Sequence, residues 1–340
     1  MSVKYALPFA CALLSSAAAH AADTDLVMNI FLPEQHFLYG ELTGWAEKVN
    51  EVTQGRVAIT TPAGSLAPPN QQYGAVTSGV ADIAVAANIF IQRKEPLVTF
   101  TMLPWLISNA EDASIALWET YEEDLSDKGL YEDVELLSLF HFAGGQAYTT
   151  DATPINSLDD MRGRKMWALP GASTKLLVET GISPVTTPAV QISEPVSSGV
   201  VSGVFGLSIE SARDFRIGTY VKTITEFPSW VSSISFSMVM NSDKWDQISE
   251  TDQKAISAIS GGVFAQQVGV AADLAYNEAR AEFVEAGVTF LQADDQFYSE
   301  LQEASAALFE DFGTVAKKRD ADGAALIQSF QAKLDEVSKR

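Results

Sequence analysis

The chain has 340 residues, enough for about two domains with substantial cores. Its 44 acidic and 22 basic residues give a net charge of −22, which excludes a nucleic-acid-binding protein because phosphates require a basic surface. With one cysteine and three histidines, the sequence offers no disulfide framework and no Cys-based or His-rich metal site. We therefore expect neither a metal nor a cofactor.

The first 21 residues are typical of a secretory signal peptide. Lys4 supplies the positive charge, an apolar stretch follows over 6–14, and Ala19-His20-Ala21 forms a small-x-small cleavage site. A membrane anchor is disfavoured because about 20 apolar residues are needed to span a bilayer, and this stretch has roughly half that number. No later apolar run in the sequence reaches that length. We predict cleavage after Ala21 and a soluble, periplasmic mature chain that has lost its single cysteine, Cys11.

Short apolar segments alternate with helical patterns along the rest of the chain. Leu42, Trp45, Val49 and Val52 recur at spacings of three and four, which predicts a helix that ends near Gly55. Another helix is expected over 70–79, and helical patterns dominate after residue 252. Strands are expected at 26–32, 57–60, 83–87, 136–142, 165–169, 236–241 and 288–291. This alternation predicts an α/β fold with sheets covered on both faces.

Motifs for catalysis are missing. The mature chain keeps two isolated histidines, His36 and His141, which we interpret as structural residues. Ser173 lies in no G-x-S-x-G or S-x-x-K pattern, and no phosphate-binding loop is present. Carboxylates are numerous, but no pair stands out as a glycosidase-like site. The sequence therefore favours a protein that is not an enzyme, and a periplasmic hydrolase remains the alternative.

Six segments in chain order carry a family pattern. They include the "G-x-x-D" of 79–82, the L-P-W-L of 103–106 and the G-V-V-S-G of 199–203; the others are 45–57, 157–166 and 241–245. Together they resemble the extracytoplasmic solute receptors of tripartite ATP-independent periplasmic (TRAP) transporters, the DctP-type family. The resemblance covers essentially the whole mature chain. A solute receptor of an ATP-driven transporter is the alternative within binding proteins.

The resemblance implies a clamshell of two α/β domains that close over one ligand in an interdomain cleft, with a helical C-terminal region. We predict that residues 22–144 and about 236–276 form the first domain. Residues 145–235 and about 277–340 are predicted to form the second, so the chain crosses between domains more than once. The implied partners are a small-molecule ligand and the small and large membrane subunits of the transporter. A monomer is expected.

Several cleft positions depart from the pattern that the resemblance implies. Most members of the family hold a ligand carboxylate with an arginine, whose planar group makes two parallel hydrogen bonds. Trp167 stands at that position here, and Gln146 stands where some members have a second arginine. Gly206, beside Phe205, replaces an asparagine that often completes the carboxylate site. The cleft is therefore expected to lack the family's anion clamp.

Other residues fall at or near cleft positions. Asn88 and Phe90 follow the strand expected at 83–87, Phe31 lies near the N-terminal strand, and Trp230 precedes the strand at 236–241. Each aromatic residue has a packing role as its alternative, whereas Trp167 is favoured as a ligand contact because its family position faces the ligand. Glu34 is the carboxylate nearest to the N-terminal cleft strand, with a solvated loop position as the alternative.

Aromatic walls without arginine suit a cation or an uncharged apolar molecule. An ammonium over a tryptophan ring gains about 0.5–2 kcal/mol. We therefore predict that the ligand is not a simple dicarboxylate but a small amine or amino alcohol of the ethanolamine type, or a neutral solute. The alternative is an organic acid held in an atypical way, with Arg213 or Arg216 reaching the cleft from another side.

Overall fold

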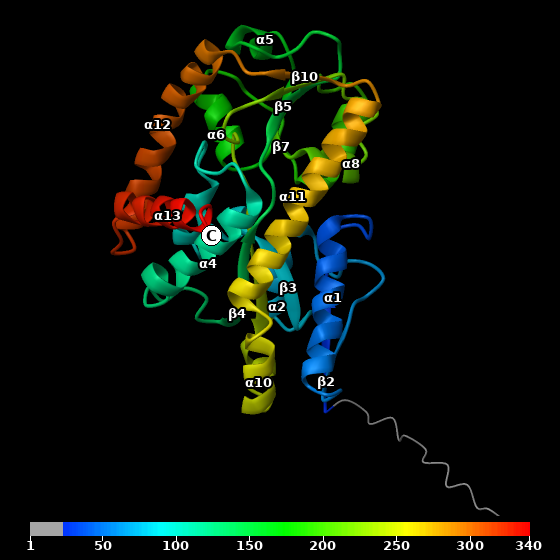
Figure 1. Ribbon diagram of the computed structural model, residues 1–340, viewed down its shortest axis with the longest axis vertical. Coiled ribbons are helices and arrows are strands. Elements are labelled where there is room, and N and C mark those ends of the chain that lie inside the picture. The colour runs from blue at the N-terminus through cyan, green and yellow to red at the C-terminus, as the bar shows by residue number, and fades with distance from the viewer. Residues whose placement is uncertain (1–22) are drawn as a thin grey trace, which may run out of the picture.

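The computed structural model describes residues 23–340 and forms two five-stranded sheets connected by helices (Figure 1). This is the predicted α/β class with two sheet-centred domains. The predicted signal peptide and its cleavage site lie outside the described residues, so both stay predictions.

The first sheet is built mainly from the N-terminal part of the chain. Its strand order is β2 (Val57–Thr60), β1 (Thr24–Asn29), β3 (Ile83–Ala87), β9 (Ser235–Asn241) and β4 (Val134–His141). β1 is parallel to β2 and β3, whereas β9 is antiparallel to both β3 and β4. All five residues of β3 are buried, which explains why its sequence is an uninterrupted apolar run.

The second sheet uses the middle of the chain and one later strand. Its order is β10 (Thr289–Gln292), β8 (Thr223–Glu226), β5 (Gln146–Thr149), β7 (Gly203–Leu207) and β6 (Met166–Ala168). β5 is antiparallel to β7 and β8, while β6 and β7 are parallel, as are β8 and β10. Every residue of β5, β6, β7 and β8 is buried.

Helices cover both sheets. The α-helices before β9 are α1 (Phe37–Val52), α2 (Gln72–Thr77), α3 (Asn88–Ile91), α4 (Ala110–Thr120), α5 (Leu158–Arg162), α6 (Ala172–Glu179), α7 (Ser193–Ser197) and α8 (Ile209–Asp214). Those after β9 are α9 (Ser242–Trp245), α10 (Glu250–Ser257), α11 (Gly261–Glu285), α12 (Asp295–Lys317) and α13 (Gly323–Val337). Short 3₁₀ segments lie at Pro69–Gln71, Leu97–Met102 and Ala189–Gln191, and a π-helical turn at Tyr121–Leu125.

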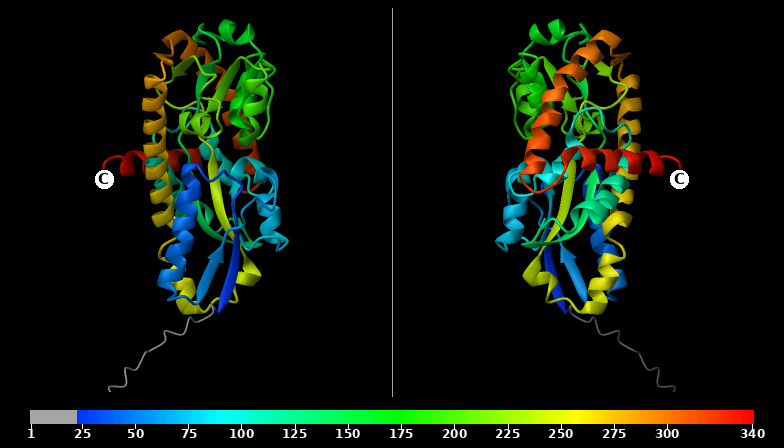
Figure 2. Two further views of the ribbon diagram at one scale, coloured as in Figure 1. Left: turned by 90° about the vertical axis from the view of Figure 1, so that its right-hand side faces the viewer. Right: turned by 90° about the vertical axis from the view of Figure 1, so that its left-hand side faces the viewer.

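The long helix α11 connects the two halves of the molecule (Figures 1 and 2). It packs against α1, α4 and β4 of the first half and against α8 of the second. The sequence predicts no apolar run of membrane-spanning length after the predicted signal peptide. The helical stretch Glu250–Glu285 is nevertheless long and apolar enough to span a membrane by length and composition. Its buried face and its contacts with both halves are instead typical of a core helix.

The C-terminal helices also reach both halves. α12 packs against α6, and α13 turns back to pack against α4 beside the first sheet. In Figure 1 these helices descend from the second sheet and then cross toward α4. The predicted assignment of residues 277–340 to the second domain, like the other domain bounds, stays a prediction.

Candidate functional site

A pocket lies between the two sheets and is lined from both sides. Its empty volume, including the part open to solvent, is about 630 Å³. The lining residues are Phe31, Leu32, Pro69, Ala87, Ile89, Phe90, Phe142, Ala143, Leu169, Pro170, Pro188, Ala189, Val190, Gly206, Leu207, Ser208, Ser211, Phe215, Ser232, Ile234 and Phe236.

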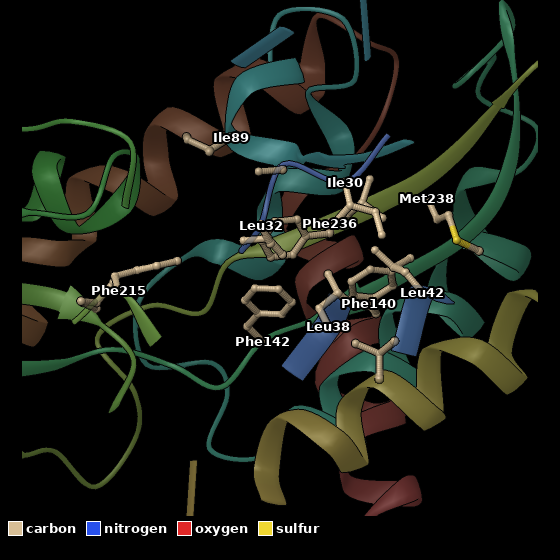
Figure 3. Packing of buried hydrophobic residues seen from close by; sticks show 14 of the residues in the cluster. Ile30, Leu32, Leu38, Leu42, Ile89, Phe140, Phe142, Phe215, Phe236 and Met238 are labelled. Atoms are coloured by element: carbon tan, nitrogen blue, oxygen red, sulfur yellow. The ribbon is translucent and has the colours of Figure 1, made fainter. Parts of the chain in front are cut away.

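Phenylalanine rings dominate the walls. Phe142 and Phe236 are buried with their ring centroids 4.1 Å apart, and Leu32 lies next to them (Figure 3). Phe215 enters from the other half of the molecule, just after α8. His36 lies behind this wall, with its ring centroid 5.3 Å from that of Phe142 and 5.7 Å from that of Phe215. Flat apolar walls of this kind suit a molecule with an apolar ring.

Serine hydroxyls are the polar side chains of the pocket. Oγ atoms of Ser208 and Ser211 lie 2.9 Å apart, and Ser232 Oγ lies 2.7 Å from the hydroxyl of Ser173 on α6. Ser208 is also hydrogen-bonded to the carboxyl of Glu210 behind it. None of the described residues that line the pocket carries a charge. The pocket therefore offers hydroxyl groups, but no ion, to a ligand.

Two chain segments cross between the sheets beside the pocket and approach each other closely. Gly145 donates its backbone N–H to the carbonyl of Ser232 at 2.9 Å. A Cβ on Gly145 would lie 2.0 Å from the carbonyl carbon of Gly206, so no larger residue fits there. Gly206 itself has a φ of 82°, and a Cβ there would lie 1.9 Å from Ser173 Oγ. Glycine at these positions allows the backbone of β7 to form part of the pocket wall.

Glu210 is a buried ionisable group behind the pocket lining, hydrogen-bonded to the lining residue Ser208. Its side chain is 0 % exposed, and burial raises its pKa to about 8, although the Ser208 hydrogen bond acts in the opposite direction. Asp214 raises the pKa of Glu210 further and Arg213 lowers it. Arg213 is itself paired with Asp214 at 2.8 Å and with Glu282 at 3.3 Å. The carboxyl of Glu210 is therefore largely protonated at neutral pH.

Three of the predicted cleft residues line the pocket. Phe31 follows β1, Phe90 lies on α3 and Gly206 lies on β7. Phe31 and Phe90 are half-buried, and their segments come from the first half of the molecule, whereas Gly206 comes from the second. The structure thus brings these residues together at one site.

Trp167, Gln146 and Phe205 do not line the pocket. Trp167 is fully buried on β6, and its indole Nε1 donates to Thr187 Oγ1 at 3.0 Å, next to the lining segment Pro188–Val190. Gln146 uses both ends of its amide, donating to Tyr276 at 3.1 Å and accepting from Phe227 N at 3.0 Å. Phe205 is fully buried on β7. A role of Trp167 in ligand contact stays a prediction, and its observed contact supports the wall segment from behind.

Asn88 and Trp230 also lie behind the lining. Asn88 is fully buried and hydrogen-bonded to Ser235 and Ser237 of β9. Trp230 is 7 % exposed, and a Cβ on Gly144 would lie 2.3 Å from its side chain. Both residues fix the crossing segments that carry the lining residues 142–143 and 232–236.

Glu34 and Arg216 line a separate, outer cavity, whose empty volume is about 1020 Å³. Both side chains are exposed. This outer cavity shares Phe31, Leu32, Val190 and Phe215 with the inner pocket, so these four residues separate the two spaces. Arg213 lines neither space and is held in its ion pairs. The charged candidates therefore lie outside the inner pocket.

Sequence reasoning missed most of the phenylalanine wall and all of the lining serines. Phe142 immediately follows β4, and Ser208 and Ser211 follow β7 at a spacing of three. The available signal was their position at strand ends, where ligands bind in open α/β sheets. Among residues 23–340 no group of three or more His, Cys, Asp or Glu side chains is placed to hold a metal ion.

Two sheets around a small apolar pocket, with walls supplied by both halves, define a substrate-binding protein of the clamshell type. Residues 28–314 match the model of bacterial extracellular solute-binding protein, family 7. The chain is also 30 % identical over 316 residues to the outer membrane transporter protein TsaT of Comamonas testosteroni, which covers 93 % of each chain. The chain therefore belongs to bacterial extracellular solute-binding protein family 7.

Solved structures of TRAP receptors share the fold. A TRAP periplasmic solute-binding protein from Bordetella bronchiseptica, with bound (R)- and (S)-mandelate, matches at a TM-score of 0.86 and 27 % identity over 92 % of this chain and 99 % of that one. A marine metagenome TRAP solute-binding protein specific for aromatic acid ligands matches at 0.84 and 25 % identity, over 92 % and 99 % of the two chains. The predicted TRAP solute receptor is thereby confirmed, and its family is extracytoplasmic.

Proposed function

We propose that this TRAP receptor captures a small solute with an apolar ring, carrying at most one polar head group, in the pocket between its sheets. The observation that carries the proposal is the lining of the pocket: five phenylalanines and several aliphatic residues, with serines as the polar side chains and no charged one. Burying a ring between such walls gains free energy from apolar contact without requiring an ionic partner.

A dicarboxylate fits this lining poorly. Each buried carboxylate loses its hydration and needs a cation or several hydrogen-bond donors in return. The described lining has no Arg, Lys or His, and Arg213 is engaged by Asp214 and Glu282. An ammonium of the ethanolamine type lacks a partner for the same reason, because Glu34 lines the outer cavity and no carboxylate lines the inner one. We therefore favour the ring-bearing solute over the amine.

The relatives support a ring. The Bordetella bronchiseptica protein holds mandelate, and the marine metagenome protein is specific for aromatic acids. These ligands combine one ring with one carboxylate, which corresponds to the alternative of an organic acid held without the usual arginine. The ring is the part of these ligands that suits the apolar lining of the pocket in this protein.

Delivery completes the proposed function. The receptor would be exported after cleavage behind Ala21 and would pass its ligand, as a monomer, to the small and large membrane subunits of a TRAP transporter. Sequencing the N-terminus of the exported protein tests the cleavage, and the predicted first residue is Ala22.

Calorimetry tests the ligand class. Benzoate, mandelate, acetophenone, succinate and ethanolamine are titrated into the purified receptor, and we expect binding of ring-bearing compounds only. Phe90→Ala removes a half-buried wall residue and should weaken ring binding by about 2 kcal/mol, roughly thirtyfold. Phe309→Ala, a half-buried phenylalanine on α12 that is not part of the lining, is the matched control and should bind as the wild type does. Tight succinate or ethanolamine binding without ring binding would contradict the proposal.

A further inference from the structure

The polar end of the inner pocket is connected to a buried carboxyl through two hydroxyls. Ser208 and Ser211 line the pocket with their Oγ atoms 2.9 Å apart, and Ser208 is hydrogen-bonded to Oε1 of Glu210. The side chain of Glu210 is 0 % exposed, and its Oε2 has no hydrogen-bond partner among residues 23–340. Glu210, Ser208 and Ser211 thus form one chain that leads from the protein interior to the pocket.

Which group donates in each hydrogen bond among Glu210, Ser208 and Ser211 depends on whether Glu210 is protonated. A hydroxyl donates one hydrogen, whereas an ionised carboxyl only accepts. If Glu210 is ionised, Ser208 donates to it and Ser211 donates to Ser208, so lone pairs remain for the ligand. If Glu210 carries a proton on Oε1, the oxygen that faces Ser208, it donates to Ser208, Ser208 donates to Ser211, and the hydrogen of Ser211 becomes available to the ligand.

We propose that Glu210 controls, through Ser208 and Ser211, whether the pocket donates or accepts hydrogen bonds, and that in its protonated form it selects ring-bearing ligands whose head group is an acceptor such as a carboxylate or carbonyl. This inference rests on the proposed function and names the head group that the ring carries. Glu210 is a positioning residue here, because it acts on the ligand through the serines that line the pocket.

The surroundings of Glu210 favour its protonated form. Burial raises its pKa to about 8, Asp214 adds to this, and Arg213 opposes it. The charge of Arg213 is shared with Asp214 and with Glu282 of α11. Two phenols also couple to Glu210, those of Tyr148 on β5 and Tyr276 on α11; burial raises the pKa of both, so they stay neutral over the range in which Glu210 titrates.

A neutral carboxyl explains how a carboxylate ligand is held without arginine. The protonated chain supplies a donor and adds no negative charge beside the anion, whereas an ionised Glu210 would place a second buried charge of the same sign near it. The absence of an arginine from the described pocket lining and the presence of a protonated Glu210 behind it are therefore compatible in one binding site. The affinity for an acceptor ligand should fall as Glu210 loses its proton.

Calorimetric titrations between pH 6.5 and 9.5 test the proposal with three ring compounds. Benzoate presents only acceptors and a charge, acetophenone presents an uncharged acceptor, and benzyl alcohol both donates and accepts. With a pKa of about 8 for Glu210, the protonated fraction falls about tenfold from pH 7 to pH 9, so the benzoate Kd should rise about tenfold. Acetophenone should weaken in the same direction by a smaller factor, and benzyl alcohol should change least.

Glu210→Gln keeps the shape of the side chain and removes the titration. Its benzoate and acetophenone affinities should be independent of pH over the same range, with circular dichroism as the check on folding. If the variant does not fold, the wild type still tests the inference, because the rise of Kd with pH should be largest for benzoate, smaller for acetophenone and smallest for benzyl alcohol. A pH-independent Kd of benzoate and acetophenone in the wild type, or a pH dependence that persists in Glu210→Gln, overturns the inference while ring binding stands. Failure of all three rings to bind at every pH overturns the proposed function together with the inference.

Discussion

His36 and His141 show what burial does to a titratable ring that has no ionic partner. Burial lowers the pKa of each to about 3, and for His36 the nearby Arg213 adds to the effect. His36 Nδ1 accepts from Leu38 N at 3.2 Å and so caps α1, while His141 Nδ1 lies 2.9 Å from Ser233 Oγ. Both histidines are therefore neutral at pH 7, and each leaves its Nε2 without a hydrogen-bond partner among residues 23–340, so the purely structural role expected from the sequence stays a prediction.

This neutrality predicts a loss of stability in acid. In the unfolded chain each histidine binds a proton near its ordinary pKa of about 6.5, whereas the folded chain binds it only near pH 3. Stability is therefore fully present above about pH 6.5 and falls with decreasing pH, by up to about 1.4 kcal/mol per pH unit for each histidine. Urea unfolding at pH 7.5, 6 and 5, compared between the wild type and a variant without the His36 imidazole, should show this decline as a difference.

His36→Asn isolates the effect, because asparagine also caps helix N-termini. The raised pKa of Glu210 acts in the opposite direction, since it stabilises the fold most below pH 4.5 and that contribution is lost as the pH rises through about 8. The comparison of wild type with His36→Asn removes this common term. An equal decline in both proteins would show that His36 does not contribute.

The residues of the pocket were only partly predictable from the sequence. Phe31 and Phe90 were placed by counting from family motifs, and both line the pocket. Phe142 and Phe215 were not, because a local pattern cannot tell which strand-end residues of one half face the other half. Trp167 illustrates a related limit: a motif fixes its place on β6, but its depth behind the segment Pro188–Val190 depends on residues 20 positions away.

At the scale of elements, α11 stabilises the start of the neighbouring helix α4. The carboxylate of Asp273 accepts the backbone N–H groups of Ala110 and Glu111, each at 2.9 Å, at the start of α4. These are N–H groups that an isolated helix leaves without partners. The local cap is Asn109, whose side chain accepts from Asp112 N at 2.8 Å. α4 therefore has one cap that the sequence pattern reveals and one that only the packing reveals.

Removal of the distant cap should destabilise the fold. We expect Asp273→Ala to lower the free energy of unfolding by about 1–2 kcal/mol, the usual loss for a helix cap, and Asp273→Asn to lower it less because the amide oxygen still accepts. Glu278→Ala on the same helix is the control, since Glu278 is exposed. Urea unfolding measures all three. Equal stability of Asp273→Ala and Glu278→Ala would contradict a capping role.

The strands that the sequence did not predict share a feature. β5, β7 and β8 have the sequences Q-A-Y-T, G-V-F-G-L and T-I-T-E, in which polar residues or glycines interrupt the apolar ones. All three strands are nonetheless buried, because neighbouring strands satisfy their polar groups: the hydroxyls of Thr149 on β5 and Thr223 on β8 lie 2.7 Å apart. Strands such as β2 and β3 were predicted with their observed bounds because their own sequences are apolar.

At the scale of the whole molecule, the two sheets are joined by few connections. The crossing segments after β4 and before β9 are bonded to each other, with Phe142 N 3.1 Å from Ile234 O and Val231 N 3.2 Å from Gly145 O. α11 runs beside both halves (Figure 2). Such narrow, paired connections allow hinge closure with small backbone changes. The sequence predicted this architecture through the family resemblance, but not the contacts that close the cleft.

One such contact lies at the outer cavity. Gln35, just before α1, donates from its side-chain Nε2 to the carbonyl of Asp214 at the end of α8, at 3.3 Å. Both residues line the outer cavity, so the bond joins the two halves of the molecule there. Because the bond joins the two halves, it should favour a closed, ligand-bound state over an open one.

Ligand binding should therefore compact the molecule, and Gln35→Ala should weaken it. A lost hydrogen bond of about 1 kcal/mol corresponds to roughly a fivefold higher Kd for benzoate. Glu34→Ala is the matched control, because the neighbouring Glu34 lines the same cavity but makes no side-chain hydrogen bond among residues 23–340. Small-angle scattering with and without saturating benzoate should give a smaller radius of gyration for the complex in all three proteins, because saturation compensates for the weaker closure. Tight binding without any change in radius would exclude hinge closure, and equal affinities of Gln35→Ala and Glu34→Ala would show that the Gln35 bond does not hold the cleft closed.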